Sequence, residues 1–218
     1  MKKILAVAAL AAFQFAAAQQ TTKDLKEFTI LAVSGNIEMA IMKSSENKMV
    51  IEDESNVLKV ASEAGALAIS NDSGETVEIV LYYSGNLENI AVSGPSEIFF
   101  KDKIKTQNLN VSVAGGSEIS IMVDTQNINI DAASGSEIKV SGKAMNFGTN
   151  VASGAEVSAD DLISENGNCV VASGGEAAVH VTGNLNATVA SGGELTVYGN
   201  PRNVHETKAD DGEINIIK

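Results

Sequence analysis

Cationic residues, cysteine and aromatic rings are scarce in this sequence of 218 residues. Lysine and arginine number 15 against 28 aspartates and glutamates, which gives a formal net charge of −13. An acidic surface repels phosphate, so nucleic acids and anionic membranes are poor candidate partners, whereas cations, basic proteins and neutral glycans stay open. The one cysteine, Cys169, excludes an internal disulfide and a cysteine cluster for zinc. Because tryptophan is absent, the core must consist mainly of Val, Ile, Leu and Ala in thin layers.

Long apolar runs are also missing, except for one at the N-terminus. Lys2 and Lys3 precede an apolar run over residues 4–15, and three alanines follow at 16–18. This pattern is typical of a secretory signal peptide over residues 1–18, with cleavage before Gln19. The run is too short to cross ~30 Å of hydrocarbon, so the sequence argues against a transmembrane anchor. We therefore expect an exported protein of the periplasm or the cell surface.

Seven glutamates recur at steps of 18 to 21 residues, and each one ends a turn of small residues. The turn before Glu97 reads Ser-Gly-Pro-Ser, and the turn before Glu137 reads Ala-Ser-Gly-Ser. A period this short, carried by glycine and serine, predicts a solenoid. The glutamates are Glu97, Glu118, Glu137, Glu156, Glu176, Glu194 and Glu213, and the turn glycines are Gly94, Gly115, Gly135, Gly154, Gly174 and Gly192.

Apolar and polar residues alternate on both sides of each glutamate, which predicts two short strands and two turns per coil. After Glu137, for example, Ile138 and Val140 are apolar and Lys139 between them is polar. Cys169 falls in an apolar column before the turn, where a small buried residue needs no redox role. Equivalent strands stacked in parallel predict an all-β fold, a flattened right-handed parallel β-helix with coils of about 19 residues. A third short strand per coil stays open.

Asparagine stands ten residues before six of the glutamates. Stacked amides ~4.8 Å apart can hydrogen-bond from coil to coil and form a ladder. Asparagine also tolerates turn geometry, which is the alternative explanation of the column. Both explanations place it at the corner opposite the glycine turn. The six residues are Asn108, Asn127, Asn146, Asn166, Asn184 and Asn203.

The glutamate column has three interpretations. Neighbouring carboxylates on the surface repel by only about 0.9 kcal/mol per pair in a water-like dielectric, so a solvated row is tolerable. Each carboxylate could instead accept hydrogen bonds from the amides of its glycine turn, which we favour. The functional interpretation is a linear site for Ca²⁺. Its candidate ligands are Glu97, Glu118, Glu137, Glu156, Glu176 and Glu194.

The period fades towards the N-terminus, although six β-rich runs continue over residues 28–33, 37–42, 49–52, 57–61, 66–69 and 77–82. Residues 34–38 and 84–88 resemble variants of the glycine turn. We expect irregular first coils over 19–91 that cap the regular repeats of 92–218, in one continuous domain over 25–218. A separate N-terminal globular domain is the alternative. At the other end Glu206 and Lys208 enter apolar columns and Asp210–Asp211 replaces Ser-Gly, which indicates a polar terminal coil.

Residues for chemistry are few. A β-helical polysaccharide lyase needs cations to neutralise a uronate, and no column of the coils supplies them. A hydrolase needs two carboxylates across a cleft, and the short turns leave no loops to wall one. His180 and His205 lie in different coils and columns, so they predict neither a triad nor a metal site. We predict no catalytic residue, no cofactor and no enzymatic activity.

The repeated Ala-Ser-Gly-small-Glu turn, the Tyr-Gly-Asn-Pro segment at 198–201 and the terminal Gly-Glu-Ile at 212–214 resemble the GIN-domain family. This family, the head domain of putative autotransporter adhesins, occurs in exported proteins of Bacteroidota-like bacteria. The resemblance spans residues 25–218 and implies a right-handed β-helix. It also implies an adhesin-like role with an unknown protein or glycan partner, and it transfers no site residues. A glycan-active enzyme and a periplasmic structural or envelope-stress partner are the alternative hypotheses.

Overall fold

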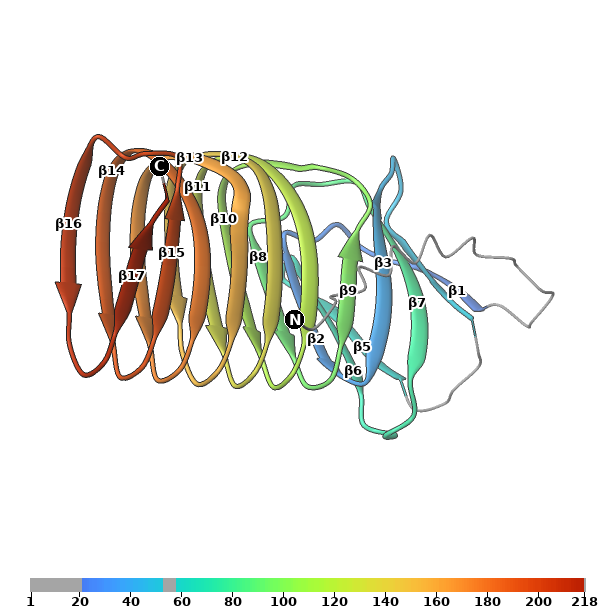
Figure 1. Ribbon diagram of the computed structural model, residues 1–218. Helices are drawn as coiled ribbons and strands as arrows, with labels where there is room; N and C mark the ends of the chain where they lie inside the picture. The colour runs from blue at the N-terminus through green and yellow to red at the C-terminus, as the bar shows by residue number, and fades with distance from the viewer. Residues whose placement is uncertain (1–20, 53–57, 218) are drawn as a thin grey trace, which may run out of the picture.

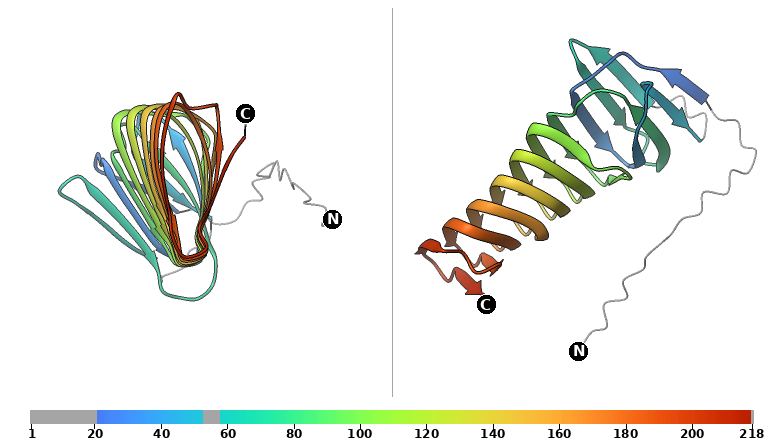
Figure 2. Two further views of the ribbon diagram at one scale, coloured as in Figure 1. Left: turned by 60° about the vertical axis from the view of Figure 1, so that its left-hand side comes forward. Right: turned by 90° about the horizontal axis from the view of Figure 1, so that it is seen from above.

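The computed structural model describes residues 21–52 and 58–217, and in this part of the chain every regular element is a β-strand. Seventeen strands join one continuous sheet that winds into a β-solenoid of about seven turns (Figure 1). Figure 2 shows the regular coils stacked along one axis, with the N-terminal strands at one end. The predicted all-β solenoid with a spacing of about 19 residues is therefore confirmed.

Parallel pairing between successive coils holds the regular part together. Glu118 pairs with Glu137, Glu137 with Glu156, and the same column continues to Glu213. The strands are β8 (Asn89–Ser93), β9 (Glu97–Phe100), β10 (Ile104–Ala114), β11 (Glu118–Ala133), β12 (Glu137–Val151), β13 (Glu156–Ala172), β14 (Glu176–Ala190), β15 (Glu194–Tyr198), β16 (Asn203–Lys208) and β17 (Glu213–Ile216).

The coils differ from the expected two strands and two turns. In β11 to β14 the strand continues through the asparagine corner, so that each coil is one long, bent strand closed by one tight turn (Figure 1). Strand pairing continues through the bend, because the asparagines stay in register from coil to coil. The asparagines therefore lie at a bend within the sheet, where we had expected a separate turn.

The glycine turns before Glu118 to Glu213 have left-handed backbone at two successive central residues. Ser153 and Gly154 have φ of 56° and 69°, and Ala155 N–H donates to the Ala152 carbonyl at 3.3 Å. Positive φ at both positions is the mark of a type I′ turn, which favours Gly at such sites. Asp210 and Asp211 adopt the same conformation in the last turn, with φ of 47° and 62°.

The core is a column of apolar layers inside the coils. Phe147 and Ile130 are buried at 2% and 0% exposure, and Cys169 is buried beside them at 1%. Thr149 lies in the same column, and its hydroxyl is the one buried side-chain polar atom of the described residues that has no hydrogen-bond partner. Burial of alternate residues explains why apolar and polar residues alternate along the strands, since each apolar side chain at an inward position removes apolar surface from water.

The N-terminal coils are stacked out of chain order. β2 (Ile30–Gly35) lies between β8 and β6 (Ala66–Asn71), and β3 (Ile37–Lys43) lies between β9 and β7 (Val77–Tyr83). The coil formed by β2 and β3 therefore separates two coils that follow it in the sequence. Three antiparallel strands complete this end, namely β1 (Thr21–Asp24), β4 (Lys48–Ile51) and β5 (Leu58–Glu63).

One of the two expected N-terminal turn variants is placed correctly and the other is not. Ser34 pairs with Ser93 and Glu38 with Glu97, so residues 34–38 form a true glycine turn. Residues 84–88 instead lead into β8, whose first residue, Asn89, pairs with Asn110. They lie at the start of a coil and not at its turn, so the Ser-Gly-Asn resemblance was misleading there.

The two ends of the solenoid are closed differently. At the N-terminal end, β5 pairs antiparallel with β6, and Leu58 and Val60 pack against the core. At the C-terminal end, Glu206 and Lys208 occupy positions in register with the buried Ala187 and Val189. Their charged atoms lie 3.6 Å apart, so an ion pair covers the last apolar layer.

Candidate functional site

The regular coils present two outer faces of very different chemistry. We call the outward residues of the strands before each turn the amide face, and those that follow each turn the glutamate face. The amide face has four columns, ten, eight, six and four residues before the glutamates from Glu118 to Glu213. Eleven of its positions are asparagine, and Asp131 is its one acidic residue. The asparagines are Asn108, Asn110, Asn127, Asn129, Asn146, Asn150, Asn166, Asn168, Asn184, Asn186 and Asn203.

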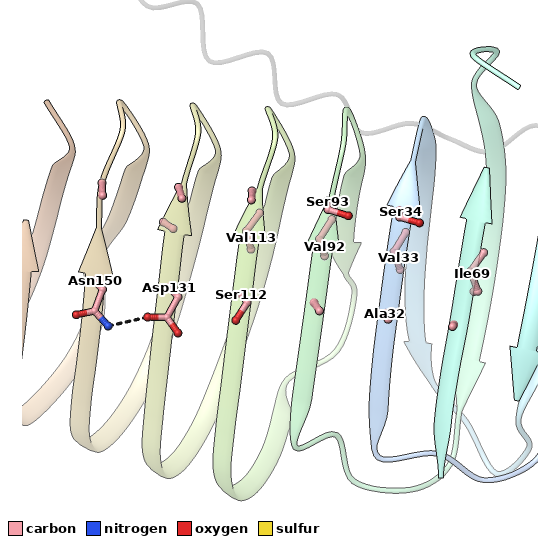
Figure 3. Close-up of a pocket in the computed structure, with 16 residues that line it drawn as sticks. Ala32, Val33, Ser34, Ile69, Val92, Ser93, Ser112, Val113, Asp131 and Asn150 are labelled. Atoms are coloured by element: carbon pink, nitrogen blue, oxygen red, sulfur yellow. Dashed lines mark hydrogen bonds between the residues drawn. The ribbon is translucent and has the colours of Figure 1, made fainter. Parts of the chain in front are cut away.

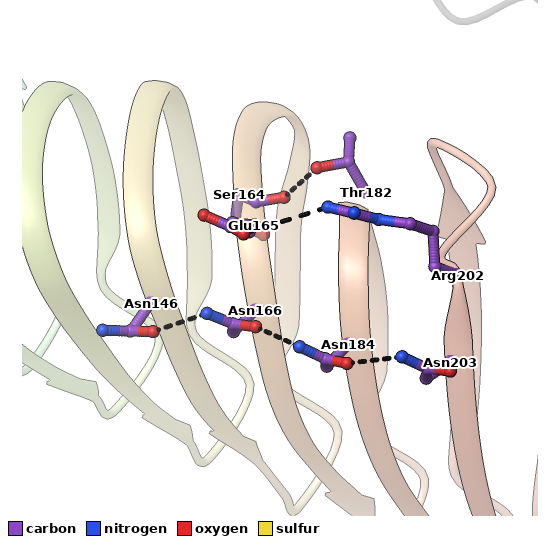
Figure 4. Close-up of polar contacts among 8 residues, drawn as sticks. All are labelled: Asn146, Ser164, Glu165, Asn166, Thr182, Asn184, Arg202 and Asn203. Atoms are coloured by element: carbon purple, nitrogen blue, oxygen red, sulfur yellow. Dashed lines mark hydrogen bonds and ion pairs between the residues drawn. The ribbon is translucent and has the colours of Figure 1, made fainter.

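A row of side-chain amides runs along the first column of this face. Each amide N–H₂ donates to the carbonyl oxygen of the preceding asparagine, as from Asn146 to Asn127 at 2.7 Å and from Asn166 to Asn146 at 2.9 Å. Figure 4 shows its C-terminal half, from Asn146 to Asn203. Each amide keeps one N–H free to point at solvent, since the amide has two donors and the ladder uses one. The six asparagines identified in the sequence thus form one continuous chain of hydrogen bonds.

A second, shorter amide row lies two residues further along the strands. Asn110 donates to Asn89 at 3.1 Å, and Asn129 donates to Asn110 at 3.2 Å. Gly148 interrupts the row because glycine has no side-chain amide, and a Cβ there would stand 2.5 Å from the Asn129 side-chain oxygen. This row was not predicted from the sequence, although asparagine recurs eight residues before several of the glutamates.

A groove of about 580 Å³ crosses the N-terminal part of the same sheet face (Figure 3). Its outward side chains come from β6, β2, β8, β10, β11 and β12, which are neighbours in space in that order. Small side chains make its floor, and the polar groups gather towards β11 and β12. The outward lining residues are Ala32, Ser34, Ala68, Ala91, Ser93, Ser112, Ala114, Asp131, Ala133, Asn150 and Ala152.

The polar end of the groove is organised by one hydrogen bond. The Asn150 amide donates to the Asp131 carboxylate at 2.6 Å (Figure 3). This contact orients both side chains and leaves the second carboxylate oxygen and the second amide N–H for other partners. A mostly apolar floor with a few oriented polar groups is the usual composition of a ligand site.

The glutamate face carries most of the charge of the coils. Its glutamate column continues past Glu97 to Glu38 and Glu78 in the N-terminal coils. Lys139 bridges two members, with its amine 2.7 Å from Glu137 and 3.2 Å from Glu118. These carboxylates raise the pKa of Lys139, Glu137 most strongly.

The glutamates do not stabilise their turns in the way we favoured. Within residues 21–52 and 58–217, no carboxylate of the column accepts a hydrogen bond from a turn amide. Serine hydroxyls do this work instead: Ser136 is buried and donates to the Val113 carbonyl at 3.1 Å, and Ser96 donates to Gly35 at 2.5 Å. In these turns, and in the one with Ser117, the serine before the glutamate links one coil to the next, whereas the glutamate side chain does not.

Four glutamates gather where the column meets the N-terminal strands. Glu38, Glu52, Glu78 and Glu97 line a hollow of about 320 Å³ together with Phe99. Partial burial and then the charges of Glu78 and Glu97 raise the pKa of Glu38. Burial and a side-chain hydrogen bond with Glu78 raise the pKa of Glu52. In the described part of the chain no three acidic, histidine or cysteine side chains are arranged to hold a metal ion, and the predicted calcium row stays a prediction.

Another hollow, of about 380 Å³, surrounds Tyr83 and three lysines. The Lys43 amine lies 4.6 Å from the centre of the Tyr83 ring and donates to the Gly85 carbonyl, so it is already engaged. Burial, and then the charge of Asp102, raises the pKa of Tyr83 to about 12. The tyrosine therefore stays a neutral phenol at physiological pH. The other lysines of this hollow are Lys103 and Lys105.

The remaining reactive side chains are separated. Burial raises the pKa of Cys169 to about 12, which keeps its thiol protonated and unreactive. The His180 ring lies near the Asp160 carbonyl at 3.2 Å, whereas His205 stands on the exposed last coil. Among the described residues, neither histidine forms a hydrogen bond with a nucleophilic side chain, and the carboxylates that gather in a hollow are those of Glu38, Glu52, Glu78 and Glu97. No helix of the described chain could cross a membrane.

The same fold occurs in solved bacterial proteins. A putative adhesin of Bacteroides fragilis superposes with a TM-score of 0.82 at 18% identity, over 91% of this chain and 96% of the other. A putative lipid binding protein of Parabacteroides distasonis has a TM-score of 0.72 at 19% identity, over 92% and 96%. A putative adhesin of the same species has a TM-score of 0.73 at 17% identity, over 92% and 98%. At these identities the likeness shows the fold alone.

Sequence comparison gives the family. No curated protein matches the chain. The family model described as the head GIN domain of putative auto-transporter adhesins matches residues 27–201. That stretch runs from just before β2 to the connection before β16, and it includes the groove and all but the last coil of both outer faces. The chain belongs to the GIN-domain family of putative auto-transporter adhesins.

Proposed function

We propose that this protein is an exported, non-enzymatic binding module of the cell envelope with an adhesin-like role. The observation that carries the proposal is the amide face with its groove of about 580 Å³. An extended surface of this kind, almost free of charge, stands out on a protein with a formal net charge of −13. Rigid solenoids use such faces to bind extended partners, because successive coils repeat the same contacts.

The names of the family and of its structural neighbours support binding over catalysis. Two of the neighbours are called putative adhesins and one a putative lipid binding protein, and none is named as an enzyme. The described residues add a physical reason, since Cys169 is buried with a raised thiol pKa and neither histidine is hydrogen-bonded to a nucleophilic side chain. A signal peptide over 1–18 completes the proposal, and that segment lies outside the described residues.

Protease treatment of intact cells tests the adhesin-like role. If the protein is at the surface, added protease should remove it from intact cells while a periplasmic marker survives. A chain that is cleaved only after the outer membrane is opened would favour the alternative role as a periplasmic structural partner. Purified protein should also bind to cells or to extracellular material, without releasing any product.

Lipid binding is a second candidate because of the groove's apolar floor and the name of one neighbour. The outward lining residues all belong to one face of one sheet, so an acyl chain would keep one side in water. Sites for apolar ligands usually bury most of the ligand surface. A fluorescent fatty acid that gains no emission on titration with the protein would dismiss this candidate.

A further inference from the structure

We propose that the amide face and its groove form a binding surface for a neutral polysaccharide chain. The inference deepens the proposed binding function, on which it rests, by naming the surface and the chemical class of the partner. Three observations carry it: the side-chain chemistry of the face, its charge, and its position on the sheet.

The chemistry of the face matches hydroxyl groups. Each of the four inner asparagines of the ladder uses one N–H and one lone pair for its neighbours and keeps one N–H and one lone pair. Amide groups both donate and accept, which is what a sugar hydroxyl requires. The ladder also fixes the orientation of every amide before binding, so that little side-chain freedom is lost when a ligand arrives.

The charge of the face selects a neutral ligand. Asp131 is the one acidic side chain of the amide face, and the coils carry no Lys or Arg there to attract a uronate or sulfate. The net charge of −13 repels acidic polymers over a distance of several ångströms. A basic partner would find its complement on the glutamate face, where the carboxylates stand in register. A neutral polymer is neither repelled by the net charge nor in need of an opposite charge, so it is the class of ligand that suits the amide face.

The position of the groove argues against an extended peptide. A peptide that adds as a strand needs an unpaired sheet edge, where main-chain hydrogen bonds supply affinity. The groove crosses the faces of strands that are paired on both sides, such as β10 between β8 and β11. Its ligand must therefore be held by side chains, from the methyl groups of Ala91 and Ala133 to the polar pair Asp131 and Asn150.

A second copy of the chain fits this face less well than a polysaccharide, because the face is small for a dimer interface. Between their outermost positions, four columns over six coils span roughly 20 Å by 24 Å, or about 480 Å² per partner, by ordinary strand and coil spacings. Stable dimers bury about 800 Å² or more on each partner. A repeating polymer needs no such area at one point, because repeated weak contacts along successive coils add by multivalency.

The test compares two alanine-to-arginine variants. Ala133→Arg places a long cationic side chain in the groove, and Ala178→Arg places the same side chain on the glutamate face as a matched control. Both alanines point outward from strands of the regular coils with similar partial burial. Circular dichroism melting should show that both variants stay folded.

The probes are neutral, acidic and basic polysaccharides in affinity gel electrophoresis and calorimetry. Dextran, mannan, xylan and laminarin serve as neutral polymers, pectate as the acidic one and chitosan as the basic one. We expect at least one neutral polymer to bind the native protein, with an affinity that changes less than about twofold between 50 and 500 mM salt. Ala133→Arg should weaken that binding at least tenfold and gain retention by pectate, and Ala178→Arg should not change neutral binding.

The outcomes separate the inference from the proposed function. Retention by pectate or chitosan alone, or equal loss in both arginine variants, would overturn the neutral-polysaccharide inference. Binding to cells that persists after deglycosylation, without retention by any neutral polymer, would also overturn it and leave the binding function intact. Failure to bind cells as well as polymers would refute the proposed function itself.

Discussion

The regular coils and the N-terminal coils share the same columns of residues, but the chain connects the coils in a different order. From β10 to β17 the coils stack in chain order, and each turn packs on the turn of the next coil. In the N-terminal part, the coil formed by β2 and β3 lies between two coils that come later in the chain. Glu38 still pairs with Glu97, and Val33 with Val92. The column chemistry is therefore preserved where the order of the coils is not.

This difference shows which contacts hold each region. In the regular coils a column residue is stabilised by identical neighbours, such as Asn127 and Asn166 around Asn146. In the N-terminal coils, single non-repeating residues fill the same positions, such as Asn71 opposite Gly35. Substitutions at matched positions should therefore cost little in the repeats and more in the N-terminal coils.

The glycine turns give the largest expected contrast. A Cβ at Gly35 would stand 1.9 Å from the Asn71 carbonyl oxygen, whereas a Cβ at Gly135 would meet nothing within 4 Å. Both residues have positive φ, at 93° and 69°. Gly135→Ala should cost about 1–2 kcal/mol for the left-handed backbone. Gly35→Ala adds a clash with backbone and should cost at least about 3 kcal/mol.

Urea unfolding of the two glycine variants measures this contrast. The midpoint should fall far more for Gly35→Ala than for Gly135→Ala, with Gly74→Ala as a control in an open N-terminal turn. Equal losses at Gly35 and Gly135 would contradict the close packing of β6 against β2 and would leave backbone strain as the common cause.

These contacts also explain which parts of the fold could be predicted from the sequence. The glutamate period predicted the solenoid, its inward columns and the asparagine row, because every repeat has the same kinds of residue at the same distances from its glutamate. It could not predict that β2 inserts between β6 and β8, because a single coil carries no signal for its neighbour when the chain returns from a distance. Residues 84–88 show the danger, since their Ser-Gly-Asn matches the turn locally and lies at a different corner.

The candidate site was less predictable than the fold. The sequence drew attention to the glutamates, whereas the groove depends on alanines and serines that line up only after β6, β2 and β8 are placed side by side. Ala68 and Ala91 lie far apart from Ala133 in the sequence and carry no chemical signal of their own. A surface made of small residues on interleaved coils becomes visible only in three dimensions.

Asparagine replacement gives the next contrast. Asn71 is 3% exposed, and its amide donates to the Asn36 and Glu75 carbonyls at 2.7 Å each. Asn71→Ala removes a buried amide together with these two hydrogen bonds and the two that it accepts from Ser73, and should cost about 2–3 kcal/mol. Asn146→Ala removes two ladder bonds at an exposed site where water can replace them, and should cost about 0.5–1 kcal/mol.

Thermal melting tests the asparagine pair. About 1 kcal/mol shifts the midpoint by roughly 2–4 °C in a chain of this size, so the two variants should be clearly resolved. Asn203→Ala, which ends the ladder and loses one bond, is the control and should melt nearest to the native protein. A larger loss for Asn146→Ala than for Asn71→Ala would mean that the ladder is strongly cooperative.

The smallest contrast is between two glutamates whose replacement by glutamine should shift the melting midpoint at pH 7 in opposite directions. The pKa of Glu38 is raised in the folded state by burial and by Glu78 and Glu97, so its contribution to stability is present at low pH and lost as pH rises through the folded pKa. Glu38→Gln should therefore raise the melting midpoint at pH 7 by about 1–2 °C and change little at pH 3.5. Glu137 forms an ion pair with Lys139 at 2.7 Å, so Glu137→Gln should lower the midpoint at pH 7 by a similar amount. Melting curves of both variants at pH 3.5, 5 and 7 decide the point, because a shift of the same sign at pH 7 would show that the glutamate column behaves alike in both regions.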